Sequence, residues 1–233
     1  FYLKTAIGLL VACILAILLQ GALVAWKRVG MEEKIATVAE ATSHMFQALH
    51  NLRVDRSNTN RFLVGDAVVP DLSDTQRGAR AAEVPALQKA LVVLRQMEFP
   101  GQAGVVSRLE SATQKLQALH DETLSAMRKP KAERRPGIAQ EFLDHVNMLL
   151  EFLSQTSDTI NGQIKLQDPL IDKLFEAKTT AWLVRNSAGE ASLMLSNAIA
   201  GIALPADAET KYAAHMAKAE AGWELLTKLF SGV

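Results

Sequence analysis

An arginine interrupts the apolar stripe of a predicted helix, and this is the most chemically unusual feature of the sequence. Between residues 31 and 65, positions 35, 38, 42, 45, 49, 52, 56, 59 and 63 recur in steps of three and four, and most of them are apolar. Arg56 falls on this stripe, with Thr59 and Asn60 close behind it and Arg53 almost one turn ahead. A guanidinium on the inward face of a helix costs several kcal/mol unless a partner or an anion meets it. Asp55 is a poor partner because neighbours in sequence point about 100° apart on a helix.

A second arginine lies in a later segment that is rich in small side chains. Trp182 and Arg185 stand among Ala181, Ala188, Gly189, Ala191 and Ser192, which leave space in a helix seam. A guanidinium offers forked donors to carboxylates and to oxyanions such as nitrate. We therefore predict a site for a small anion, formed by Arg53, Arg56, Thr59, Asn60, Trp182 and Arg185. The alternative is structural: Arg56 pairs with a buried carboxylate that fixes the helix register, and Arg185 extends along the surface.

Other chemistries have no candidate residues in this sequence. His44 and His50 are six residues apart, and no histidine has a second histidine four residues away, the spacing that helical metal sites favour. Glu141 and His145 have that spacing, but a single such pair predicts a surface contact. Phosphate-loop, nucleophile-elbow and zinc motifs are missing, so we expect no catalytic residues, no metal, no cofactor and no enzymatic activity. The balance of 25 basic and 25 acidic residues argues against nucleic-acid binding.

The residues of interest are predicted to lie on long helices separated by short loops. After the first helix, a loop at residues 66–72 leads to Ser73, which with Gln76 forms a capping box for a second helix. Phe99-Pro100-Gly101 is a predicted turn before a third helix, which ends near Lys129-Pro130. The basic segment at residues 129–135 is predicted to be a solvated loop.

The segment from residue 137 to 202 keeps the three-and-four spacing without a slip. The phase continues through Asp168-Pro169, which predicts one continuous helix kinked at Pro169. Because such a helix would be close to 100 Å long, it predicts two helical layers stacked end to end. A last helix contains Tyr212 and Phe230. No segment alternates like a strand, so the predicted fold class is all-α, with antiparallel helical bundles.

The first residues are predicted to form a membrane anchor. Residues 5–26 contain no charge, and about 20 apolar residues suffice to cross a membrane. We therefore divide the chain into a transmembrane helix at 1–28 and an extracytoplasmic sensor domain at 29–233 that continues past the last residue. A cleaved signal peptide is the alternative. Lys4 on one side and Lys27 with Arg28 on the other place more positive charge beside the sensor domain, which the positive-inside rule disfavours.

Two stretches resemble signatures of a known family. Leu52-Arg53-Val54-Asp55-Arg56-Ser57-Asn58-Thr59 is similar to a Leu-x-x-Glu-Arg-x-x-Thr pattern in sensor domains of bacterial methyl-accepting chemotaxis receptors, of the nitrate/nitrite-sensing-like and helical bimodular types. The stretch from Ala181 to Gly189 resembles the second signature, an aromatic residue, an arginine and a glycine. Asp55 departs from the usual glutamate. The resemblance implies four-helix bundles, a homodimer, a nitrate-like or carboxylate ligand near the arginines, and a place in the bacterial inner membrane with the helical domain in the periplasm.

The sequence thus favours signal reception across a membrane. In this hypothesis, a small anion binds within a helical bundle and shifts the helices of a chemoreceptor that controls chemotaxis. Two alternatives are the sensor region of a histidine kinase or diguanylate cyclase, and a membrane-tethered structural spacer without a ligand. The spacer hypothesis predicts a carboxylate against Arg56 and no cavity nearby.

Overall fold

The computed structural model describes residues 2–166, 168–199, 201 and 203–231; along the first helix, the side chains of residues 2–17, 24, 25, 27 and 28 are not described. Every regular element in this part of the chain is helical, which confirms the predicted all-α class. The elements are α1 (Tyr2–Val64), α2 (Asp74–Gln96), α3 (Gln102–Met127), the 3₁₀ turn η1 (Lys131–Glu133), α4 (Ile138–Asn161), α5 (Pro169–Ile199) and α6 (Ala208–Phe230).

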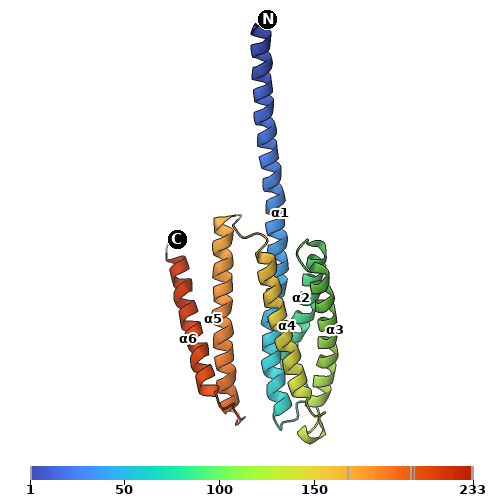
Figure 1. The fold of residues 1–233 in the computed structure, drawn as a ribbon. Helices are drawn as coiled ribbons and strands as arrows, with labels where there is room; N and C mark the ends of the chain where they lie inside the picture. Colours follow the sequence, from blue (N-terminus) through green and yellow to red (C-terminus); the bar gives the residue numbers. More distant parts are fainter. Residues whose placement is uncertain (1, 167, 200, 202, 232–233) are drawn as a thin grey trace.

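The second half of α1 forms a four-helix bundle with α2, α3 and α4 (Figure 1). The predicted stripe of α1 faces inward, since Val38, Met45 and Leu52 are at most 1% exposed. The stripes of α3 and α4 meet it through Leu109, Leu116, Phe142, Leu149 and Leu153, all fully buried. Burying each such side chain contributes about 1.5–3 kcal/mol, so this shared core holds the four helices in register.

The bundle helices begin and end at residues that satisfy their free backbone groups. The Ser73 hydroxyl accepts a hydrogen bond from the Gln76 backbone N–H at 3.3 Å, as the predicted cap requires. The prediction for residues 129–135 was wrong for one residue, because Arg134 is 7% exposed. Its guanidinium donates to the carbonyls of Phe62, Leu63 and Gly65 at 2.7–2.9 Å. Arg134 therefore caps the C-terminus of α1, where carbonyls lack helical partners.

The predicted continuous helix from 137 to 202 is wrong, because α4 ends at Asn161 and α5 begins at Pro169. Leu166 has a φ of 65°, which no α-helix tolerates. The Asp168 carboxylate accepts hydrogen bonds from the backbone N–H groups of Leu170 and Ile171 at 2.8 and 3.1 Å, so it caps a new helix. Pro169 fits the first helical position, where no N–H is needed. The even spacing of apolar residues across this break does not reflect a continuous helix.

The helices α5 and α6 form a hairpin that lies beside the bundle instead of being stacked on its end (Figure 1). They approach closely at Gly222, where an added Cβ would lie 2.7 Å from Val184 Cγ2. The three-and-four spacing of residues 137–202 includes Leu170, Leu174 and Leu195 and places them in a buried seam, but they are 49–64% exposed. The hairpin thus has little core of its own and contacts the bundle through partly buried side chains such as Phe175 and Trp182.

The N-terminal half of α1 extends beyond the bundle as one uninterrupted helix of 63 residues in total (Figure 1). Among the described residues, no helix combines the length and apolar character that a membrane crossing requires. Most side chains of the predicted span at residues 5–26 lie outside the described residues, as do those of Lys4, Lys27 and Arg28.

Candidate anion-binding cleft

The inward arginine of α1 contacts both α4 and α5. Arg56 is 8% exposed. Its Nη1 donates to Asn147 Oδ1 on α4 at 2.6 Å, and its Nη2 donates to Glu190 Oε1 on α5 at 2.7 Å. The guanidinium therefore bridges the bundle and the hairpin.

Two further arginines, Arg53 and Arg185, lie over the ring of Trp182 beside this contact. Arg53 Nη1 is 3.6 Å from Glu190 Oε1, and its guanidinium carbon lies 4.7 Å from the centre of the Trp182 ring. Arg185 approaches the same ring at 5.5 Å and places Nη2 3.1 Å from His50 Nδ1. Trp182 in turn packs on Phe46 of α1, with ring centroids 4.6 Å apart. The tryptophan thus positions two guanidinium groups by cation–π contact.

Positive charge is in excess at this point of the molecule. Two guanidinium groups contact one carboxylate, that of Glu190, whose Oε1 accepts from Arg56 and lies near Arg53. A third, that of Arg185, lies over the same Trp182 ring as Arg53. Burial, followed by repulsion from Arg56, lowers the pKa of Arg53 to about 10 and also lowers the pKa of Arg185. The buried Nε atoms of Arg53 and Arg56 have no hydrogen-bond partner. These observations describe a cationic cluster that Glu190 neutralises only in part.

An open cleft lies beside the arginines, between α1 and α5. It has a volume of about 400 Å³ and is lined by Arg53, Val54, Arg56, Ser57, Asn58, Arg185, Gly189, Ser192, Leu193 and Ser196. The small side chains of α5 produce this space, since nothing lies within 4 Å of a Cβ added at Gly189. A more apolar groove of about 690 Å³ adjoins the cleft and shares Arg185 with it; Phe46, Lys178 and Trp182 also line this groove.

The structure brings together four of the six predicted site residues. Arg53, Arg56, Trp182 and Arg185 form the cationic cluster, whereas Thr59 and Asn60 do not line the cleft. Thr59 is fully buried on another face of α1, because it lies six residues after Arg53 and so points about 120° away from it. Glu190 and Asn147 were missed. The positions of Glu190 and Asn147 within their own helices do not indicate a binding role. Only their tertiary contacts with Arg56 do so.

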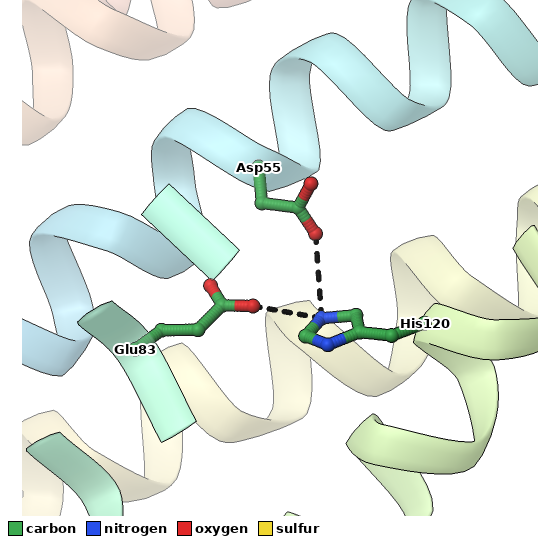
Figure 2. A group of neighbouring side chains, drawn as sticks. All are labelled: Asp55, Glu83 and His120. Atoms are coloured by element: carbon green, nitrogen blue, oxygen red, sulfur yellow. Dashed lines mark ion pairs between the residues drawn. The ribbon is translucent and has the colours of Figure 1, made fainter. Parts of the chain in front are cut away.

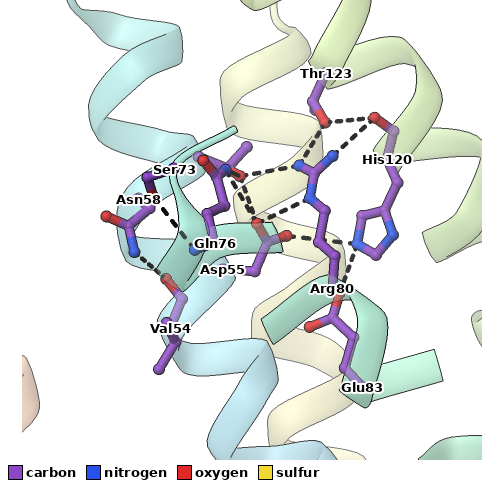
Figure 3. A network of polar contacts seen from close by, with 10 residues as sticks. Val54, Asp55, Asn58, Ser73, Gln76, Arg80, Glu83, His120 and Thr123 are labelled. Atoms are coloured by element: carbon purple, nitrogen blue, oxygen red, sulfur yellow. Dashed lines mark hydrogen bonds and ion pairs between the residues drawn. The ribbon is translucent and has the colours of Figure 1, made fainter. Parts of the chain in front are cut away.

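Thr59 belongs to a separate polar network, which the sequence did not reveal. Figure 3 shows its centre, where Asp55, Gln76 and Arg80 meet. Asp55 Oδ1 accepts hydrogen bonds from Arg80 Nε at 2.9 Å, from Thr59 at 2.8 Å and from Gln76 Nε2 at 3.2 Å. Arg80 also donates to Thr123 at 3.0 Å and to the carbonyl of His120 at 3.0 Å. The network ties α1, α2 and α3 together inside the bundle.

The buried carboxyl groups in this network differ in their acidity. Burial raises the pKa of Glu83 above its usual range. Burial acts in the same direction on Asp55, but the close contact with His120, together with the charge and hydrogen bond of Arg80, outweighs it and lowers the pKa of Asp55. Asp55 is therefore the stronger acid, and Arg80 is its counter-ion.

The histidines outside this network make ordinary contacts. The ring of His145 hydrogen-bonds the Ala112 carbonyl at 2.9 Å. Its predicted partner Glu141 instead pairs with Arg135 and Lys115, at 2.7 and 3.2 Å. The pair predicted from the spacing of Glu141 and His145 is therefore not formed.

Comparisons of this chain with models of protein families, with curated proteins and with solved structures find no match. The function must be argued from the cleft itself.

Proposed function

We propose that this chain is the sensor region of a membrane receptor and that it binds a small anion in the cleft between α1 and α5. The observation that carries this proposal is the excess of positive charge, Arg53, Arg56 and Arg185 against Glu190, beside an open volume. Forked N–H donors suit nitrate or a carboxylate. The adjoining apolar groove extends the candidates to carboxylates with an apolar body.

A signal would arise because the ligand contacts come from two different helices. The anion is held by arginines of α1 and α5, so it draws the hairpin towards the bundle or moves Glu190 away from Arg56. A displacement of an ångström or two between packed helices is typical of such receptors. The proposal extends to a membrane anchor at 1–28, which is based on the apolar N-terminal segment. It extends also to a homodimer and a chemotaxis output, which are based on the family resemblance.

Thermal unfolding of the full 233-residue chain in detergent tests the proposal. Sodium nitrate, acetate and benzoate are titrated against equal concentrations of sodium chloride, so that general salt effects cancel. We expect nitrate or a carboxylate to raise the melting temperature, and Arg56→Ala and Arg185→Ala to abolish the increase. Arg108→Ala is the matched control, because Arg108 belongs to α3, lies over Phe152 of α4 and does not line the cleft.

The spacer hypothesis makes the opposite prediction. The contact of Glu190 with Arg56 favours it, because a purely structural arginine requires a carboxylate partner. The cleft beside that pair is the feature that it does not account for. If no anion shifts the melting temperature of the wild-type chain beyond chloride, the binding proposal is wrong and the spacer role stands.

A further inference from the structure

Three potential metal ligands from three helices converge inside the bundle (Figure 2). They are Asp55 of α1, Glu83 of α2 and His120 of α3, and one ligand atom from each lies within 4.8 Å of the other two. His120 Nε2 is 2.7 Å from Glu83 Oε1 and 3.4 Å from Asp55 Oδ2. Asp55 and Glu83 are 1% and 0% exposed, so the carboxylates have lost their water.

The atoms that face one another in this cluster lack hydrogen-bond partners. Asp55 Oδ2, both carboxylate oxygens of Glu83 and His120 Nε2 are all buried and unpartnered. The short distance from Nε2 to Glu83 Oε1 does not have the angle of a hydrogen bond. A single N–H cannot point at two carboxylates, whereas a cation placed between them attracts both. Unsatisfied buried carboxylate oxygens are rare and require an explanation.

We propose that Asp55, Glu83 and His120 bind a divalent transition-metal cation of the zinc class. Zinc takes histidine nitrogen and carboxylate oxygen at about 2.0–2.2 Å, so tetrahedral ligands lie about 3.3 Å apart. The separation of 3.4 Å between His120 and Asp55 already fits this geometry, and that of 2.7 Å between His120 and Glu83 must widen by about 0.6 Å. Three protein ligands leave the fourth position for water. Magnesium and calcium are disfavoured because they prefer sets of six or more oxygens.

Surrounding side chains orient one of the ligands for this role. Arg80, Thr59 and Gln76 all donate to Asp55 Oδ1 and leave Oδ2 directed at His120. Arg80 is held away from the point of convergence by Thr123 and the His120 carbonyl. Such outer contacts fix the orientation of metal-binding carboxylates. The metal would join α1, α2 and α3 at the height of the cationic cluster, since Asp55 lies between Arg53 and Arg56.

Calorimetric titration of the full chain with zinc chloride, after treatment with a chelator, tests this site. We expect one zinc ion per chain, and a higher melting temperature because the folded state binds the ion better than the unfolded state. Glu83→Gln and His120→Asn should weaken binding by more than about 100-fold, beyond the effect of losing an outer contact. His44→Ala is the control, since it removes a partly exposed histidine that pairs with Glu40 and is not one of the three proposed ligands.

The outcomes separate this site from its alternatives. The proposal is overturned if the wild-type chain binds no zinc, if Glu83→Gln binds it equally well, or if His44→Ala removes the binding. Should the two variants fail to fold, the absorption spectrum of the wild-type chain with cobalt decides. Tetrahedral bands at one equivalent support the site, and their absence refutes it. Arg56→Ala should keep the zinc response, so that this test is independent of anion binding.

Discussion

One turn of α1 has two polar surfaces, which differ in how the protein balances their charge. Asp55 faces α2 and α3, where its Oδ1 accepts three hydrogen bonds and Arg80 supplies its counter-ion. Arg53 and Arg56 face α4 and α5, where they share the carboxylate of Glu190 next to an open cleft that Arg185 also lines. On the first surface, the protein itself supplies the counter-ion of Asp55, and the atoms left without hydrogen bonds are the ligand atoms of the proposed zinc site. On the second surface the positive charge is in excess, as the proposed anion site requires.

Removal of Arg80 should have the largest effect, because it leaves the buried carboxylate of Asp55 without its counter-ion. Arg80 and Asp55 have side chains that are 9% and 2% exposed, so solvent cannot compensate. We expect Arg80→Met to lower the free energy of unfolding by about 3–5 kcal/mol. Urea denaturation in the presence of a chelator measures this value.

The double variant Asp55→Asn with Arg80→Met is the control for that experiment. It removes both charges, so much of the lost stability should return. If the double variant loses as much stability as the two single variants added together, the two side chains do not act as a unit and Arg80 is not the counter-ion of Asp55.

A smaller effect is expected when the carboxylate of the second surface is neutralised. Glu190→Gln leaves Arg53, Arg56 and Arg185 without a negative group, and should cost about 1–2 kcal/mol at low salt. Nitrate or acetate should restore this stability more strongly than chloride does, and should bind the variant more tightly than the wild type. Equal responses of variant and wild type in thermal unfolding would show that no anion replaces Glu190.

Two glycines of the hairpin should respond in opposite directions to the same substitution. Gly189→Ala adds a methyl group to the open cleft and should stabilise α5 by up to about 1 kcal/mol, because alanine is the better helix former. Gly222→Ala should destabilise the chain, since its Cβ would meet Val184 at 2.7 Å. Calorimetric melting compares the two. Destabilisation by Gly189→Ala would mean that the space beside it is filled.

The smallest effect concerns pH and arises at the rim of the cleft. Burial, together with the charge of Arg185, lowers the pKa of His50 below its ordinary 6.5. The unfolded chain therefore takes up this proton first, so the stabilising contribution of neutral His50 is present above pH 6.5 and is lost as the pH falls. The loss of stability on acidification should be smaller in His50→Gln than in the wild type. An identical pH profile, measured by urea denaturation, would contradict the contact with Arg185.

The sequence predicted the helices well where burial determines them. The inward stripe of α1, the cap at Ser73 and the turn that ends at Gly101 follow from spacing and from residue type alone. The break before α5 was missed because the spacing of apolar residues does not report the backbone at Leu166. Asp168-Pro169 is a strong helix start, and in this chain it outweighed the continuous phase.

Only those residues of the candidate site that are unusual for their position in the sequence could be predicted. Arg56 is conspicuous because it replaces an apolar residue, and Arg185 because it lies among small ones. Glu190 and Asn147 look like ordinary surface residues of their helices, and only tertiary contact with Arg56 gives them a role. The same holds for Asp55, Glu83 and His120, which come from three helices and follow no sequence motif.

The continuity of α1 has a mechanical consequence. A helix of 63 residues measures about 95 Å at 1.5 Å per residue, and roughly half of it extends free of the bundle. With its lower half clamped by α2, α3 and α4, the free half acts as a lever about 50 Å long. A tilt of about one degree at the clamp moves the far end by roughly 1 Å, so a barely detectable change in packing near Arg56 becomes a displacement of atomic size at Tyr2.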